Sequence, residues 1–191
     1  MIKAIIFDCF GVLTEDGWLD FKRRHFTGDD ERHERALELN HMVDAGLLAY
    51  DDFTAQMAEL AGTTSQEVQA SLERTVPNRE LLKFIEEELK PYYKIGLLSN
   101  VSGDWLGRLF TQEQVALFDA KALSYEIGAT KPDPLAYETI IARLDITPEE
   151  AIFTDDQERF VTGAKEQGIH GIHFQNTAQF MRDLTETLEQ G

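Results

Sequence analysis

The sequence predicts an α/β fold: a doubly wound parallel sheet that is covered by helices on both faces and interrupted by an all-helical insert. Two observations lead to this prediction. Short apolar runs alternate along most of the chain with segments of helical periodicity, as in a parallel sheet with helical crossovers. Between about residues 15 and 77 only helical patterns follow one another. The 191 residues, 42% of them hydrophobic, suffice for one core domain, residues 1–14 and 78–191, with the insert at 15–77.

The expected strands are five apolar runs rich in Ile, Val, Phe and Leu. They are residues 2–7, 94–98, 121–124, 151–154 and 171–174. Each run is short and hydrophobic, which is the pattern of a strand buried on both faces of a parallel sheet. Helices are expected between them. Residues 79–89 and 134–144 carry apolar side chains at spacings of three and four, Asp133 is expected to cap the second of these helices, and a final helix is expected over 177–191.

The insert reads as a series of helices separated by glycines. Helical patterns cover residues 31–43, 50–60 and 65–72. Asp51 or Asp52 is expected to cap the second of these helices, and Thr64 or Ser65 the third, because short polar side chains satisfy the free N–H groups of a first turn.

The charge of the chain excludes several classes of partner. With 18 Lys and Arg against 35 Asp and Glu, the formal net charge is −17. Nucleic acids and anionic membrane surfaces bind clustered cations, so neither is an expected partner. No window approaches the roughly 18 consecutive apolar residues of a membrane helix. The single cysteine excludes a disulfide framework and is compatible with the cytoplasm, the expected location. No motif indicates an oligomeric state.

Polar side chains follow the expected strands at the point where each strand ends. The carboxyl ends of parallel strands lie along one edge of the sheet, where ligands bind. The residues at this edge are Asp8, Ser99, Asn100, Lys131, Asp155 and Asp156. We therefore expect carboxylates, a hydroxyl, an amide and an amine to converge there.

Such a set of side chains suits phosphoryl chemistry. A carboxylate can attack phosphorus or an activated carbon, but crowded carboxylates repel a phosphate dianion unless a divalent cation lies between them. Mg²⁺ fits, because it accepts one or two carboxylates, a backbone oxygen, waters and a substrate oxygen. Lys131 would neutralise charge on the transferred group, and the Ser99 hydroxyl would donate a hydrogen bond to it.

Four motifs of this sequence resemble those of the haloacid dehalogenase-like hydrolases. They are FDCFGVLT at 7–14, LLSN at 97–100, TKPDPLAYE at 130–138 and IFTDD at 152–156, in the family's order and strand context. The helical insert lies where this family places its cap, between the first motif and the first core helix. The resemblance implies a Rossmann-like core with a helical cap, and Mg²⁺-dependent hydrolysis of a small phosphorylated metabolite.

The resemblance also implies roles for individual residues. Asp8 would be the nucleophile, forming an aspartyl-phosphate, and would bind Mg²⁺ together with the backbone carbonyl of Phe10 and with Asp156. Asp155 would lie behind these ligands or act as an alternate one. Ser99 and Lys131 would hold the phosphoryl group, and Asn100 would contact the substrate or orient its neighbours.

One position departs from the family's phosphatases, which commonly carry a second Asp two residues after the nucleophile as general acid and base. Here it is Phe10, which cannot transfer a proton, and such a loss lowers a rate by about 10²–10⁴. Three interpretations stay open: a phosphatase for good leaving groups or with water or a cap residue as proton donor, a 2-haloacid dehalogenase-type hydrolase, or a non-catalytic binding or regulatory protein. The pair Asp155-Asp156 favours the first over the second, because the dehalogenase branch needs no metal and generally lacks paired acids here.

Several other side chains are expected to have structural roles. Cys9 follows the nucleophile, but alternation turns it away from Asp8, so we expect a small core residue. His170 and His173 have opposite parity around the last strand, which suits neither a metal pair nor a proton relay.

Aromatic residues and histidines of the insert have two interpretations each. Trp18, Phe21 and Phe26 are expected to form the core of the insert, with a substrate wall as the alternative, and Trp105 after the second motif has the same ambiguity. The histidines are His25, His33 and His41. We expect them to be solvated polar residues, with contact to substrate as the alternative.

Overall fold

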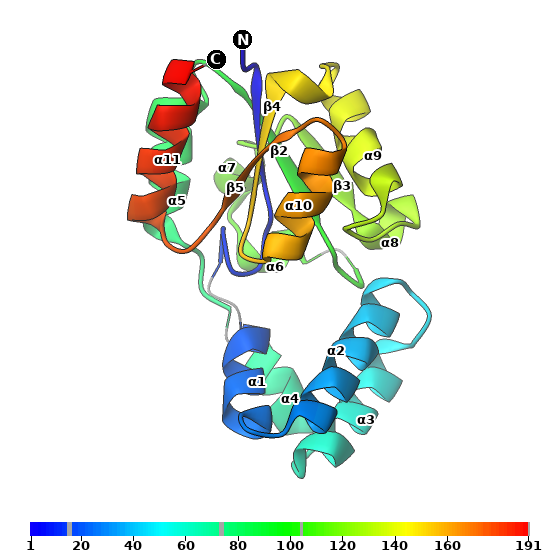
Figure 1. Ribbon diagram of the computed structural model, residues 1–191. Coiled ribbons are helices and arrows are strands. Elements are labelled where there is room, and N and C mark those ends of the chain that lie inside the picture. The colour runs from blue at the N-terminus through cyan, green and yellow to red at the C-terminus, as the bar shows by residue number, and fades with distance from the viewer. Residues whose placement is uncertain (15–16, 73–74, 104, 191) are drawn as a thin grey trace.

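The computed structural model describes residues 1–14, 17–72, 75–103 and 105–190 and confirms the predicted α/β fold (Figure 1). Five parallel strands form one sheet in the order β3-β2-β1-β4-β5. The strands are β1 (Ala4–Phe7), β2 (Lys94–Ser99), β3 (Ala120–Leu123), β4 (Ala151–Asp155) and β5 (His170–His173). Each overlaps its expected run, although Ser124 begins a helix and Phe174 follows β5 instead of ending it.

Side-chain alternation along β1 explains how one strand serves two hydrophobic layers. Ile5 and Phe7 belong to one cluster of buried residues, and Ala4 and Ile6 belong to a second cluster. β1 is also the central strand, hydrogen-bonded to β2 on one side and to β4 on the other. The residue that follows it, Asp8, therefore lies at the middle of the carboxyl edge of the sheet.

Helices cover both faces of the sheet, as predicted (Figure 1). One face is covered by α5 (Arg79–Phe84), which continues as the π-helical turn η1 (Ile85–Leu89), and by α11 (Thr177–Gln190). The other face is covered by α9 (Pro134–Leu144) and α10 (Glu158–Glu166). Asp133 caps α9 as expected, because its Oδ1 accepts a hydrogen bond of 2.9 Å from the backbone N–H of Leu135.

Several of the described helical segments lack a counterpart in the prediction. The short ones are α6 (Leu106–Leu109), α7 (Gln112–Val115), α8 (Ser124–Ile127) and the 3₁₀ turn η2 (Pro148–Glu150), and a longer one is α10. The first three have four residues each, about one helical turn, which is too short for periodicity to show.

The insert consists of four described helices that pack around their own buried cluster. They are α1 (Gly17–Phe26), α2 (Asp30–Asp44), α3 (Tyr50–Ala61) and α4 (Ser65–Leu72). The sequence patterns gave no span for α1, whose Trp, Phe and His residues are poor helix formers. Thr64 accepts a hydrogen bond from the N–H of Glu67 and so caps α4, as expected. The capping expected for α3 is wrong, because Ala49 precedes the helix. Asp51 and Asp52 lie in its first turn, where their negative charges interact favourably with the positive end of the helix dipole.

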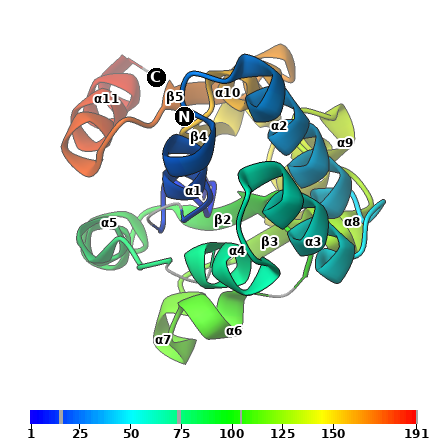
Figure 2. The same ribbon diagram turned by 90° about the horizontal axis from the view of Figure 1, so that it is seen from below.

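The insert lies beyond the carboxyl edge of the sheet (Figure 1), and in the view from below its helices lie in front of the sheet (Figure 2). Thr14, which precedes the insert, and Pro77, its last residue, form an antiparallel bridge. The insert also contacts the core directly, because the Ser124 hydroxyl lies 3.0 Å from the carbonyl oxygen of Asp44 at the end of α2. Within the described residues, no helix has the length and apolar character that crossing a membrane requires.

Candidate active site

Lys131 joins two carboxylates at the carboxyl edge of the sheet. Its Nζ lies 2.6 Å from Oδ1 of Asp8 and 2.6 Å from Oδ2 of Asp155, and all three side chains are buried. The rings of Phe153 and Phe160 lie 5.3 and 5.1 Å from the same ammonium group. A buried cation is thus held by two anions and two aromatic faces, which fixes its position.

Burial and neighbouring charge change the proton affinity of these groups. Burial raises the pKa of Asp8 to about 8, because the attraction of Lys131 offsets only part of the desolvation and the charge of Asp155 adds to it. For Lys131, burial favours the neutral amine, but the charges of Asp155 and Asp8 outweigh burial and raise its pKa. One lysine therefore does not balance the negative charge that gathers at this edge.

Three carboxylates form a group that could hold a metal ion. Oxygens of Asp8, Asp155 and Asp156 lie within 4.8 Å of one another. Both oxygens of Asp155 are already engaged, because Oδ2 pairs with Lys131 and Oδ1 accepts a hydrogen bond of 2.8 Å from the N–H of Gln157. Hard carboxylate oxygens are the ligands that Mg²⁺ prefers. The residues present therefore fit a magnesium ion held by Asp8 and Asp156, with Asp155 behind them.

Gly11 leaves room for Asp156. Its φ of +88° is a left-handed conformation that glycine adopts without strain, and a Cβ at this position would lie 2.7 Å from Cγ of Asp156. The glycine of the first motif is thus explained by the carboxylate of Asp156, which follows β4 and lies far away in the sequence.

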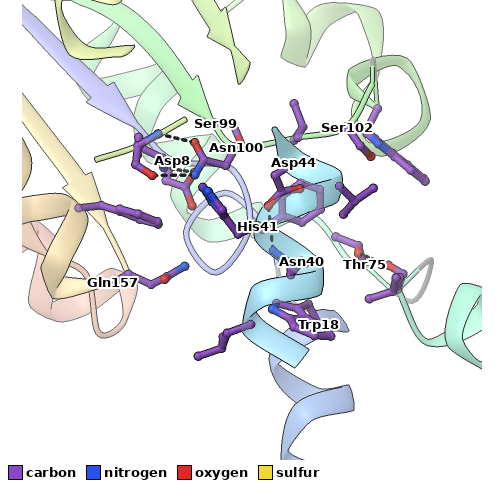
Figure 3. Close-up of a pocket in the computed structure, with 18 of the residues that line it drawn as sticks. Asp8, Trp18, Asn40, His41, Asp44, Thr75, Ser99, Asn100, Ser102 and Gln157 are labelled. Atoms are coloured by element: carbon purple, nitrogen blue, oxygen red, sulfur yellow. Dashed lines mark hydrogen bonds and ion pairs between the residues drawn. The ribbon is translucent and has the colours of Figure 1, made fainter. Parts of the chain in front are cut away.

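Ser99, the last residue of β2, and Asn100, which follows it, are brought to the same place as Asp8 (Figure 3). The Ser99 hydroxyl is buried and has no hydrogen-bond partner among the described residues, so a ligand oxygen could satisfy it. Asn100 donates a hydrogen bond of 3.1 Å to the carbonyl of Lys131 and accepts one of 2.8 Å from its N–H. Asn100 therefore orients the loop that carries Lys131.

A cavity of about 710 Å³ extends from Asp8 to the insert. Its aromatic wall comes from both parts of the chain, with Trp18 and Tyr50 from the insert and Phe10 and Trp105 from the core. The rings of Tyr50 and Trp105 lie 5.9 Å apart, centroid to centroid. The cavity is large enough for a substrate with a sizeable organic part, since pockets for drug-sized ligands measure about 300–1,000 Å³.

The expectations for the aromatic residues of the insert are met in part. Phe21 and Phe26 are fully buried in the cluster of the insert, as expected. Trp18 packs against that cluster, as expected, and also lines the cavity, where the alternative of a substrate wall would place it. Cys9 is a buried residue of the core, as expected.

Two histidines lie at this site. His41 is exposed, as expected of a solvated residue, and it also lines the cavity and points toward Asp8 and Asn100 (Figure 3), where the alternative of substrate contact would place it. Nε2 of His173 lies 2.9 Å from the carbonyl oxygen of Asp156 and so supports the backbone of the site. No local signal marks either residue, because both contacts depend on how separate segments dock.

The comparison with known families agrees with this geometry. A family model described as haloacid dehalogenase-like hydrolase matches residues 2–168. The chain belongs to the haloacid dehalogenase-like hydrolases. This confirms the resemblance that the four motifs indicated. The carboxylates at the strand ends are therefore the candidate catalytic groups of this hydrolase.

Individual relatives of this haloacid dehalogenase-like hydrolase include phosphatases. A D-ribitol-5-phosphate phosphatase from Bacteroides thetaiotaomicron is 28% identical, over 98% of this chain and 99% of the relative. A family enzyme from the same organism, in complex with magnesium and inorganic phosphate, superposes with a TM-score of 0.67 at 26% identity, over 92% of this chain and 95% of that one. An L-2-haloacid dehalogenase from Xanthobacter autotrophicus with chloropropionic acid covalently bound gives 0.68 at 22% identity, over 97% and 83%, and shares the fold.

Proposed function

We propose that this protein is a Mg²⁺-dependent phosphatase that hydrolyses a small phosphorylated metabolite through an aspartyl-phosphate on Asp8. One observation carries the proposal. The carboxylate of Asp8 lies beside Lys131, a buried hydroxyl and two further carboxylates at the floor of a large cavity. The relative named as D-ribitol-5-phosphate phosphatase supports a phosphorylated substrate, as does the complex with magnesium and inorganic phosphate.

In this proposal, individual side chains have separate roles in phosphoryl transfer. Asp8 attacks the phosphorus atom, and the Ser99 hydroxyl and the Lys131 ammonium bind oxygens of the phosphoryl group. Asn100 holds the backbone of Lys131, and Asp155 holds its ammonium.

Asp8, Asp156 and the backbone carbonyl of Phe10 would hold the magnesium ion. When bound, Mg²⁺ supplies positive charge that offsets the crowded carboxylates and the phosphate oxygens.

The helical insert, residues 15–77, serves in this proposal as a cap over the site. It contributes Trp18, Tyr50 and His41 to the cavity wall, whereas the reactive carboxylates come from the strands of the core. A cap placed in this way excludes bulk water and contacts the organic part of the substrate.

The test is hydrolysis of 4-nitrophenyl phosphate by the purified protein with Mg²⁺ and with EDTA. We expect activity that requires the metal and falls at least about a thousandfold in Asp8→Asn, because the nucleophile is removed. Full activity of that variant would contradict the proposal. Halide release from a 2-haloacid in EDTA would instead support the dehalogenase alternative, and Mg²⁺ or phosphate binding without turnover on a broad panel of phosphate esters would support the binding protein.

A further inference from the structure

Hydrolysis of a phosphate ester of an ordinary alcohol needs a proton that Phe10 cannot supply. When the bond between phosphorus and the ester oxygen breaks, that oxygen takes the electron pair, and an alkoxide is a poor leaving group without a proton donor. A nitrophenolate leaves without one. Phe10, two residues after Asp8, presents only a phenyl ring to the cavity.

Few of the described side chains that line the cavity suit this task. Lysine, arginine and tyrosine ordinarily keep their protons at neutral pH, a carboxylate of ordinary pKa has already lost its own, and Asp8 is the proposed nucleophile. Lys131 is moreover held between two carboxylates, and the Asp44 carboxylate accepts a hydrogen bond of 2.8 Å from Asn40. Imidazole both donates and accepts a proton near neutrality. Within the described lining, His41 is the imidazole.

The position of His41 matches the requirement. It lies near the carboxyl-terminal end of α2, and its ring points toward Asp8 and Asn100 across the cavity (Figure 3). The end of this helix is docked on the core, since the Asp44 carbonyl lies 3.0 Å from the Ser124 hydroxyl that follows β3. The imidazole thus approaches the site from the side opposite the strands, where the organic part of a substrate bound at Asp8 would extend.

We propose that His41 is a catalytic residue, the general acid and base that replaces the missing carboxylate at position 10. This inference rests on the proposed function. As Asp8 attacks phosphorus, the bond to the ester oxygen breaks, and the imidazolium of His41 gives its proton to that oxygen, releasing the alcohol. The neutral imidazole then takes a proton from water, whose oxygen attacks phosphorus. The bond to Asp8 breaks, its electron pair returns to the carboxylate, and phosphate leaves with the imidazolium restored.

The experiment compares two leaving groups in one variant. In His41→Gln, kcat/KM for glycerol 3-phosphate should fall by about 10²-fold or more, the range for loss of general acid catalysis. The fall for 4-nitrophenyl phosphate should be at least about tenfold smaller, because its leaving group needs no proton in the first step. Equal losses on both esters, or no loss on glycerol 3-phosphate, would overturn the role of His41 and leave the proposed function standing. If the unchanged protein hydrolyses neither ester in the presence of Mg²⁺, both the proposed function and the role of His41 are overturned.

Two further variants sharpen the result. His33 lies eight residues earlier on α2 and does not line the cavity, so His33→Gln should change neither rate. Phe10→Asp in the His41→Gln background places a carboxylic acid two residues after Asp8, where this chain lacks one. This change should restore at least about a tenth of the lost rate on glycerol 3-phosphate. A matching loss in His33→Gln would show that α2 acts only structurally and would overturn the proposal.

Discussion

The carboxyl edge of the sheet and the helical insert face each other across one cavity, but they contribute side chains of different kinds. The edge supplies Asp8, Lys131 and Asp155, which are buried and fixed by ion pairs of 2.6 Å. The insert supplies Trp18 and His41, which project from helices that have their own core. The proposed nucleophile is therefore tied to the register of the strands, whereas the side chains of the insert, the proposed acid His41 among them, can change without altering the core.

The largest difference in stability should appear between two lysines of the cavity. Lys131→Met leaves two buried carboxylates without their cation, and we expect the free energy of unfolding to fall by about 3–5 kcal/mol. Lys22→Met in the insert, whose ammonium lies 5.2 Å from the Trp18 ring, should cost less than about 1 kcal/mol. Urea unfolding measures both. Similar losses would refute the contrast between edge and insert.

Two glycines with positive φ allow a second matched comparison. Gly11→Ala and Gly46→Ala should both cost about 1–3 kcal/mol from backbone strain. Only Gly11→Ala brings a Cβ to 2.7 Å from Asp156, whereas nothing lies within 4 Å at Gly46. Calorimetric titration should therefore show Mg²⁺ affinity lowered by about 10–100-fold in Gly11→Ala and unchanged in Gly46→Ala. Unchanged affinity in Gly11→Ala would mean that Asp156 is not a ligand.

Truncation of an aromatic side chain of the insert should act on substrate binding. In Trp18→Ala, we expect KM for an aryl phosphate to rise about tenfold and kcat to fall by a smaller factor, because an apolar contact is lost away from the reacting atoms. Tyr92→Ala is the control, since Tyr92 is 77% exposed and outside the described cavity lining. Steady-state kinetics decide the matter, and a fall confined to kcat would place Trp18 in the chemical step.

The smallest effect concerns an ion pair at the surface of the core. Asp119 is partly buried, which opposes its charge, but hydrogen bonds from Lys90 and from the N–H of Ile95 outweigh burial and lower its pKa. The resulting stability is present above the ordinary pKa of 3.8 and is lost as the pH falls through the lowered value. Asp119→Asn should therefore lower stability by about 0.5 kcal/mol at pH 7 and by less at pH 3, as acid and neutral urea titrations can show.

The site could be predicted from the sequence wherever it depends on strand ends. Asp8, Ser99 and Asp155 each end or follow a hydrophobic strand, and parallel strands bring their carboxyl ends together whatever the loops do. The pairing of Lys131 with both Asp8 and Asp155 needed the structure, because it depends on where a loop places one long side chain. Whether His41 and Trp18 line the cavity stays open in the sequence for a related reason, because the docking of a helical insert depends on surface contacts that leave no periodic pattern. The cytoplasmic location stays a prediction.

The bridge between Thr14 and Pro77 has a consequence for how such a protein can diversify. Since the chain leaves the core and returns at neighbouring points, the length and identity of what lies between hardly affect the closure entropy, which changes by only about 0.6 kcal/mol for each doubling of loop length. The insert is in this sense an exchangeable module. Replacing the chain between these two points would exchange the helices of the insert and leave Asp8, Lys131 and Asp155 at the edge of the sheet in place.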